Sequence, residues 1–422
     1  MVDVLVTNGP VLIGIAAAFG FLMAWGIGAN DVANAMGTSV GSNAITIKQA
    51  IIIAMIFEFA GAFLAGGEVT STIRNGIIDA AYFTDVPEYL VYGMIGSLLA
   101  AGIWLVVASA LGWPVSTTHS IIGAIIGFAA VGVSVDSVEW GKVVGIVGSW
   151  VVTPAISGFI AYTIFQSVQK LIFNTDDPLA NAKRYVPFYM ALAGFVMSLV
   201  TITKGLKHVG LHFSTLEAYL LAGAVALAVG IFGKVAISRL KMSNKADRQT
   251  QFGNVEKVFA ILMVVTACCM AFAHGSNDVA NAIGPLAAVV SVVESGGVIG
   301  SKSVLAWWIL PLGAVGIVLG LALFGKRVMQ TIGKNITHLT PSRGFAAELA
   351  AASTVVIASG TGLPISTTQT LVGAVLGVGM ARGIAAINIG VVRNIVVSWV
   401  VTLPAGAGLS IIFFYIIKDI FS

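Results

Sequence analysis

The stretch GANDVANAMG at residues 28–37 decides the fold, because it sets an Asn-Asp pair inside a long apolar segment. The pattern returns as GSNDVANAIG at residues 275–284, again within a long apolar segment. An ionised aspartate near the middle of a membrane-crossing segment costs about 3 kcal/mol or more, and such residues usually have a functional role. The repeated pattern therefore predicts two related functional segments in a membrane protein.

The composition of the whole chain agrees with a membrane location. Of the 422 residues, 9% are charged and 58% are hydrophobic, and the mean hydropathy is +0.98. A soluble domain has about 25% charged residues, and a disordered chain needs low hydrophobicity. Twelve apolar stretches between residues 10 and 417 predict about twelve transmembrane segments, since about 20 helical residues cross the hydrocarbon core.

Two further matches extend the repeat along the chain. WPVSTTHSIIGAIIG at residues 113–127 corresponds to LPISTTQTLVGAVLG at residues 363–377. SWVVT at residues 149–153 recurs unchanged at residues 398–402. Three matches in the same order, at a nearly constant offset, indicate a duplicated unit.

The duplication divides the chain into three parts. We predict a first repeat at residues 1–168, connecting spans and a central cytoplasmic loop at 169–256, and a second repeat at 257–422. Each repeat contains five predicted crossings, and an odd number inverts the second copy relative to the first. Inverted repeats are typical of secondary transporters, whose binding site lies near the membrane midplane where discontinuous helices meet.

Four predicted spans are irregular. The segments 10–45 and 257–293 are longer than a membrane requires and contain the Asn-Asp pairs, so we expect broken or unwound helices there. The segments 113–133 and 363–381 are short and Gly-rich, and each either crosses as half-helices or re-enters as a hairpin. The predicted fold class is thus an all-α integral membrane protein with two inverted repeats.

The distribution of basic residues predicts the orientation. If the N-terminus lies outside, most Lys and Arg residues fall in cytoplasmic loops, where basic residues of membrane proteins collect. We therefore expect a multi-pass protein of the cell inner membrane with both termini outside. The net charge of +4 follows from this topology and does not indicate a nucleic-acid partner.

The two Asn-Asp pairs have the ligand chemistry of a cation site. No Lys or Arg lies near either pair in the sequence, so a bound cation is a suitable partner for the aspartate charge. Carboxylate and amide oxygens are hard ligands that suit Na⁺, with proton coupling through the same aspartates as the rival. Asn34 and Asn281 follow four residues after the asparagines and share a helix face with them. The candidate sodium ligands are Asn30, Asp31, Asn277 and Asp278.

The two Ser-Thr-Thr segments have the donors of an anion site. Pro114 and Pro364 stand just before them, and proline favours the first turn of a helix. The N–H groups and positive dipole end of such a turn attract an anion, and hydroxyls add neutral donors. Close packing of small residues is the alternative role. The candidate anion ligands are Ser116, Thr117, Thr118, Ser366, Thr367 and Thr368.

Two histidines accompany these motifs. His119 and Gln369 occupy matching positions, and because glutamine cannot titrate, we expect hydrogen bonding rather than a symmetric proton role. His274 precedes the second Asn-Asp pair where the first copy has Ile27, and we interpret it as a packed polar residue.

Three further charged residues lie inside predicted spans. Glu58 and Glu348 are expected to line the transport pathway or to pair with a base. Arg393 lies in the last span, where it is a candidate partner for Glu348 or for the anion. A structural ion pair is the simpler interpretation, because charges inside a membrane usually pair with one another.

A charge argument connects the cation and anion motifs. Neutral donors can bind an oxyanion such as phosphate, but they cannot neutralise its charge in a low-dielectric environment. Cations at Asp31 and Asp278 would supply the missing positive charge, so each ligand would bind better when the other is present. The motifs therefore predict cotransport of an oxyanion with cations.

The motifs resemble those of the PiT-type inorganic phosphate transporters. The resemblance is carried by GANDVANAMG at 28–37, GSNDVANAIGP at 275–285, PVSTTHS at 114–120 and PISTTQT at 364–370, and it spans nearly the whole chain. It implies a prokaryotic transporter that imports inorganic phosphate with sodium by alternating access. The short central loop distinguishes this chain from animal members of the family.

The resemblance also implies roles for individual residues. Phosphate would lie between the two Ser-Thr-Thr segments, and the family's acidic transport positions correspond to Glu58 and Glu348. Family members are often homodimers, so the partners implied are phosphate, sodium, the lipid bilayer and a second copy of the chain. The motif residues expected to join the hydroxyls at the phosphate are Asp31, Asn34, Asp278 and Asn281.

Other functions fit the sequence less well. A proton-coupled phosphate permease and a sulfate permease are the alternatives, and phosphate is favoured because it can donate a hydrogen bond to an acidic side chain. A channel typically has symmetric subunits rather than inverted repeats. No metal-ligand spacing or nucleophile pattern indicates an enzyme.

Overall fold

The computed structural model describes residues 2–111, 113, 115–242, 248–299, 305–332, 339–383 and 389–421, and for a few of these, Asn34 among them, the backbone alone. Regular structure in the described residues is helical, apart from one bridge between Ile78 and Val138. The α-helices are α1 (Val2–Gly41), α2 (Ile47–Ala65), α3 (Gly67–Asn75), α4 (Pro87–Leu111), α5 (Thr117–Gly132), α6 (Trp140–Val168), α7 (Pro178–Thr203), α8 (Thr215–Ser238), α9 (Arg248–Glu294), α10 (Ile309–Ile332), α11 (Pro341–Gly360), α12 (Thr367–Arg382) and α13 (Ile389–Phe421).

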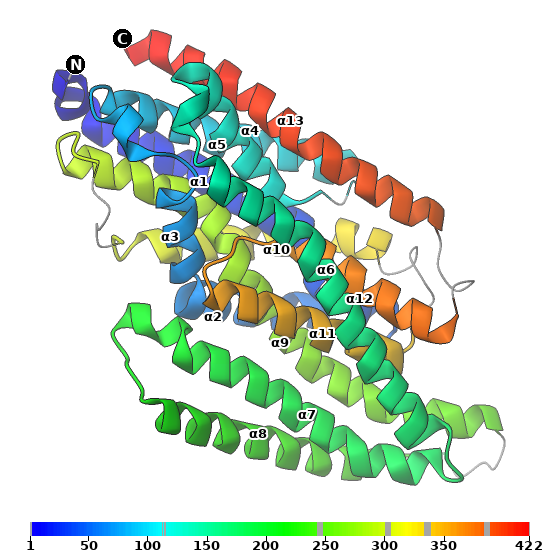
Figure 1. The fold of residues 1–422 in the computed structure, drawn as a ribbon. Helices are drawn as coiled ribbons and strands as arrows, with labels where there is room; N and C mark the ends of the chain where they lie inside the picture. Colours follow the sequence, from blue (N-terminus) through cyan, green and yellow to red (C-terminus); the bar gives the residue numbers. More distant parts are fainter. Residues whose placement is uncertain are drawn as a thin grey trace.

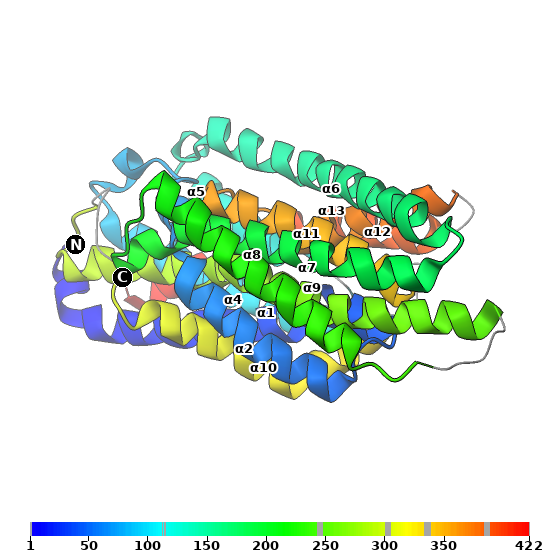
Figure 2. The same cartoon turned by 90° about the horizontal axis from the view of Figure 1, so that it is seen from below.

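The helices have the length and composition of membrane spans. Eight helices in the described part of the chain are long and apolar enough to cross a membrane, and α5 and α10 contain shorter apolar helices. The all-helical membrane class is therefore confirmed, while the total of twelve crossings stays a prediction. Both termini lie at the same end of the molecule (Figures 1 and 2), as an even number of crossings requires.

The motif-bearing helices α1 and α9 lie in the middle of the bundle. The helix α1 packs against α4, α9 and α10, and α9 packs against α2, α3 and α11. The hairpin of α7 and α8 forms one edge, and α13 runs along the opposite edge (Figure 1). The α5–α13 and α12–α6 packings use corresponding elements of the two predicted repeats.

Glycines of the Asn-Asp motifs let neighbouring helices approach closely. A Cβ atom on Gly28 would lie 2.0 Å from the Ile317 carbonyl oxygen on α10. A Cβ atom on Gly275 would lie 2.3 Å from the Glu58 carbonyl oxygen on α2. Side chains rarely tolerate such contacts with backbone, so both positions require glycine. The motif thereby sets α10 against α1 and α2 against α9.

The helices α1 and α9 run without interruption through their Asn-Asp pairs, so the expectation of broken helices there is wrong. The Asn and Asp side chains find partners on other helices, and the backbone therefore has no need to open. The irregular backbone lies instead between α4 and α5 and between α11 and α12, where residues 115–116 and 363–366 are not helical. These segments are the ones that carry the Ser-Thr-Thr motifs.

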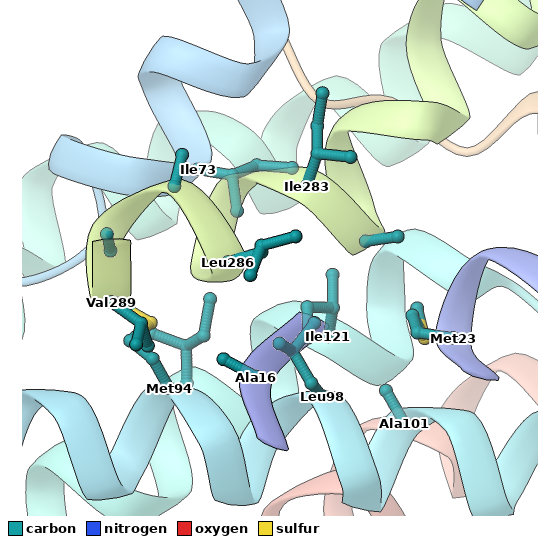
Figure 3. Close-up of a cluster of buried hydrophobic side chains, with 14 of the residues drawn as sticks. Ala16, Met23, Ile73, Met94, Leu98, Ala101, Ile121, Ile283, Leu286 and Val289 are labelled. Carbon is teal, nitrogen blue, oxygen red and sulfur yellow. The ribbon is translucent and has the colours of Figure 1, made fainter. Parts of the chain in front are cut away.

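An apolar plug lies where α1, α3, α4, α5 and α9 meet (Figure 3). Each of its labelled side chains is at most 1% exposed. Apolar side chains buried to this degree exclude water from this part of the described core. The plug consists of Ala16, Met23, Ile73, Met94, Leu98, Ala101, Ile121, Ile283, Leu286 and Val289.

Candidate functional site

Serine caps start the two helices of the Ser-Thr-Thr motifs. Ser116 precedes α5 and accepts a hydrogen bond from the His119 N–H (3.2 Å). Ser366 precedes α12 and accepts from the Gln369 N–H (3.3 Å). Both caps are buried, so two helix N-termini with their unpaired N–H groups open inside the protein. Thr368, the second threonine of the Ser366-Thr367-Thr368 motif, is buried in the first turn of α12.

Pro364 does not occupy the first helical turn, contrary to the prediction. Pro364 lies two residues before the cap Ser366, and Pro114 lies outside the described residues. The extended backbone of the cap, with φ −90° and ψ 111° at Ser366, marks the start of the helix. A serine hydroxyl therefore fixes this terminus where we had expected the proline ring to do so.

The structure brings each Ser-Thr-Thr motif against the Asn-Asp pair of the same repeat. Thr117 donates its hydroxyl to Asp31 Oδ2 (3.0 Å). Thr367 donates its hydroxyl to Asp278 Oδ2 (2.8 Å). All four side chains are at most 2% exposed. The hydroxyl and carboxylate motifs thus form two equivalent contacts in the interior.

The asparagines of the two pairs are also held in equivalent ways. Asn30 donates its amide to the Ser109 hydroxyl (3.1 Å) and the Trp113 carbonyl (3.2 Å). Asn277 donates to the Ser359 hydroxyl (3.0 Å) and to the Leu363 carbonyl (3.3 Å). Because each nitrogen is used as a donor, each amide oxygen is left to accept from, or coordinate, another group.

Asn281 connects the second repeat to the first. Its amide donates to the hydroxyls of Thr117 (3.3 Å) and Thr118 (3.2 Å). Thr118 in turn donates to the Ile365 carbonyl (2.8 Å). The side chain of Asn34, predicted as the counterpart of Asn281, lies outside the described residues. The two Ser-Thr-Thr motifs therefore meet through Asn281 and Thr118.

His274 is a buried polar residue, as predicted, and it lies among three carboxylates that the sequence did not place beside it. Its Nε2 is 2.8 Å from Asp278 Oδ2 and 3.9 Å from Asp31 Oδ2. Its Nδ1 is 3.3 Å from Glu58 Oε1. The four side chains are at most 1% exposed. His274 stands four residues before Asp278 on one helix, and this spacing was the signal that could have revealed it.

The site leaves several buried oxygens without a hydrogen-bond donor. One oxygen of Asp31, one of Asp278 and both oxygens of Glu58 lack a hydrogen-bond donor, and Glu58 Oε1 faces His274 Nδ1 at 3.3 Å. Ligand atoms of Asp31, His274 and Asp278 all lie within 4.8 Å of one another. Carboxylate and amide oxygens without donors are suited to a hard cation. The unpaired amide oxygens belong to Asn30, Asn277 and Asn281.

Glu348 lies in a separate cage of hydroxyl groups on α1 and α9. It accepts hydrogen bonds from Thr38, Ser39 (2.7 Å) and Thr266 (2.7 Å). Arg393 is exposed on α13, so the proposed pairing of Arg393 with Glu348 does not occur. Three hydroxyl donors stabilise the buried carboxylate and remove the need for a base.

His119 hydrogen bonds as expected. Its Nδ1 faces the Trp399 carbonyl (3.4 Å), and its ring stacks on Trp150 with 3.7 Å between ring centroids. Trp150 donates to the Pro364 carbonyl (3.3 Å). These residues connect α5 and α6 with α12 and α13 beside the two helix starts.

Comparison with known proteins places the chain in a family. Residues 27–410 match the phosphate transporter family. A candidate phosphate permease of Haemophilus influenzae is 59% identical over 420 residues, covering 100% of both chains. A chloroplastic inorganic phosphate transporter of Arabidopsis thaliana is 42% identical, covering 96% of this chain and 72% of its own length.

A solved structure has the same fold. It is described as a sodium-dependent phosphate transporter, it is 42% identical, and it superposes with a TM-score of 0.90 over 97% of this chain and 100% of its own. The buried duplicated site, the match over most of the length and the shared fold agree on one assignment. The chain is a multi-pass membrane protein that belongs to the phosphate transporter family.

Proposed function

We propose that the protein imports inorganic phosphate together with sodium by alternating access. The observation that carries the proposal is the pair of equivalent contacts, Thr117 with Asp31 and Thr367 with Asp278, in which an anion donor already faces a cation ligand. The name of the superposed structure, a sodium-dependent phosphate transporter, supports the same coupling.

Phosphate would bind between the two buried helix starts. The N–H groups of the first turns and the hydroxyls after Ser116 and Ser366 are neutral donors that can surround a tetrahedral oxyanion. Asn281 already contacts two of these hydroxyls and would add an amide donor. An oxyanion that drew the threonine hydroxyls toward itself would release the oxygens of Asp31 and Asp278.

Sodium would bind at the oxygens that have no donor. Asp31, Asp278 and Glu58 carry three carboxylates, and the single imidazole of His274 offsets at most one of them. Phosphate would add further negative charge, which is costly in a low-dielectric interior. Cations at the Asn-Asp pairs would neutralise this excess, so each ligand would strengthen the binding of the other.

One observation favours a second coupling ion. His274 touches three carboxylates and can carry a proton between them, which makes proton-coupled phosphate uptake the alternative. Proteoliposomes separate the two possibilities: labelled phosphate uptake is measured with an imposed sodium gradient or an imposed pH gradient. Phosphate uptake driven by the pH gradient in the absence of sodium would identify protons, rather than sodium, as the coupling ion. Excess unlabelled sulfate in the same assay measures selectivity.

A double substitution tests the role of the aspartates. Asp31→Asn with Asp278→Asn retains acceptors for the threonine hydroxyls but removes both charges, so sodium-stimulated phosphate uptake should be abolished. Asp85→Asn, in an exposed turn, is the matched control and should retain uptake. Undiminished uptake with the same sodium dependence in the double variant would refute the proposal.

A further inference from the structure

We propose that a cavity of about 370 Å³ at the predicted outer end of the protein is a second phosphate site, which receives the anion before it reaches the central hydroxyls. The inference rests on the proposed function, because it assigns an entry site to the same transport. The charged side chains that line the cavity are Arg74, Asp79 and Glu139.

The position of the cavity connects it to the central site. Ala288 and Ser291 of α9 form part of its wall. Asn281 lies on the same helix, seven residues earlier, which corresponds to about 10 Å along the axis. The plug residues Ile283 and Leu286 lie between Asn281 and Ala288 on this helix, and Figure 3 shows them among the other plug side chains. The apolar plug therefore separates the cavity from the central hydroxyls, as a closed outer gate would.

Backbone contacts order the two segments that carry the acidic residues, and Asp79 Oδ1 also accepts a hydrogen bond from the Ala81 N–H (3.0 Å). The Asp79 N–H donates to the Ser137 carbonyl (2.8 Å), and the Glu139 N–H donates to the Ile77 carbonyl (2.9 Å). These bonds flank the Ile78 bridge and align the two acidic residues on adjacent segments. The wall of the cavity is thus built by ordered backbone rather than by two loose loops.

Close helix packing holds the base. Arg74 is in the last turn of α3 and is partly buried. A Cβ atom on Gly284 of α9 would lie 2.7 Å from the neighbouring Ile73 side chain. The helix α3 is therefore pressed onto α9, and Arg74 is held at the cavity near the outer end of the plug.

The mixed charge of the lining selects the chemistry of the ligand. A guanidinium group binds an oxyanion through paired N–H donors, and it opposes the binding of a metal cation. Carboxylates repel a fully ionised oxyanion but accept hydrogen bonds from a protonated one. Phosphate at neutral pH retains at least one P–OH group, whereas sulfate has none. Arg74 with Asp79 and Glu139 therefore suits protonated phosphate better than sulfate, which has no hydrogen to donate to the carboxylates.

An entry site of this kind should act on the apparent affinity of transport. Such a site raises the local concentration of phosphate on the outer side of the plug, but it makes no contact with the central site. Weakening it should raise KM while the maximum rate stays close to that of the unmodified protein. A purely structural role of Arg74 would lower the maximum rate instead.

The first test measures sodium-driven phosphate uptake by Arg74→Gln and Lys142→Gln proteoliposomes. Losing a charged donor to the anion should raise KM about tenfold in Arg74→Gln with little change in maximum rate. Lys142 is exposed in the first turn of α6 and is not part of the cavity lining, so Lys142→Gln controls for surface charge. An unchanged KM in Arg74→Gln, an equal rise in Lys142→Gln, or a lost maximum rate would overturn the entry site.

The second test keeps Arg74 and detects binding directly. Ser291→Cys is prepared in a Cys268→Ala, Cys269→Ala background and labelled from outside with a membrane-impermeant maleimide. Phosphate should slow the labelling several-fold, and equal sulfate should not. Equal rates with and without phosphate, or labelling only from the inner side, contradict the proposal. If the unmodified protein transports no phosphate in the uptake assay, the proposed function itself fails, and the labelling result then stands on its own.

Discussion

Replacing Gly275 by alanine tests whether the close approach of α2 and α9 builds the site. The new Cβ atom would lie 2.3 Å from the Glu58 carbonyl oxygen, whereas ordinary contacts begin near 3.4 Å. The helix α2 must therefore retreat by about 1 Å, because a backbone atom cannot rotate away. Overpacking of this kind costs about 1–3 kcal/mol, partly offset by the higher helix propensity of alanine, about 1 kcal/mol.

The retreat of α2 has a consequence for the site. Glu58 would move away from His274, whose Nδ1 now lies 3.3 Å from Glu58 Oε1. A buried carboxylate that loses its partner costs about 1–3 kcal/mol, and 1.4 kcal/mol corresponds to about a tenfold change in an equilibrium constant. We therefore expect phosphate uptake at low substrate to fall about tenfold or more in Gly275→Ala.

The assay compares initial rates of sodium-driven phosphate uptake in proteoliposomes with thermal unfolding in detergent. Gly14→Ala is the matched control, since it lies in α1 with no atom within 4 Å of its new Cβ and should retain both properties. Gly28→Ala meets the Ile317 carbonyl at 2.0 Å and should lower the unfolding temperature as well. Rates and unfolding temperatures for Gly275→Ala equal to those of Gly14→Ala would show that the reasoning is wrong.

Three further predictions concern single contacts. His119→Gln introduces the residue found at the matching position of the second repeat, so uptake should stay within about twofold; complete loss would assign a specific role to the imidazole. Glu348→Ala removes the carboxylate that accepts from three buried hydroxyls, of which Thr266 retains a second acceptor, and should destabilise the protein by about 2–4 kcal/mol in detergent unfolding, unlike the exposed Glu294→Ala. Asn30→Ala and Asn277→Ala break equivalent bonds, so sodium should raise the unfolding temperature less in both variants; an effect confined to one would contradict equivalent cation sites.

The fold class and the duplication of the Asn-Asp and Ser-Thr-Thr motifs could be predicted from the sequence, because long apolar stretches and repeated motifs are visible in it directly. Apolar stretches mark the helices directly, and the repeat at residues 113–127 and 363–377 locates the two serine-capped helix starts. The prediction placed helix breaks at the Asn-Asp pairs of α1 and α9, where the structure has none. A buried Asn-Asp pair can find hydrogen-bond partners either in the opened backbone of its own helix or in side chains of other helices, and the sequence does not distinguish the two. Ser109 and Ser359 supply those partners, and their contacts depend on tertiary packing.

The three carboxylates around His274 were not predicted, for a related reason. A histidine in an apolar segment has no partner that sequence spacing identifies unless its neighbours on other helices are known. Asp278 is within one turn and could have been recognised, but Glu58 reaches His274 only because Gly275 and Gly61 let α2 approach α9. The close approach of α2 and α9 depends on glycines, and in a sequence glycines are usually interpreted as flexible positions or helix breaks.

The equivalent and the unequal contacts of the two halves have different implications for transport. Thr117 with Asp31 and Thr367 with Asp278 are the same interaction twice, so an exchange of conformation between the halves would leave the central ligands unchanged. The charges beside them are unequal. Gly275 packs on the backbone of the acidic residue Glu58, whereas Gly28 packs on the backbone of the apolar Ile317, and Ile27 occupies the position that corresponds to His274.

A carrier with identical halves would have two conformations of equal free energy and would rest equally in both. The His274–Glu58 contact exists on one side alone, so it favours one of the two packings of α2 and α9 over the exchanged arrangement. The structure has the packing that contains this contact, and in it the side chains of the apolar plug are buried. The duplicated contacts therefore suit ligand binding, and the His274–Glu58 contact, which occurs in one half, can bias the choice between conformations.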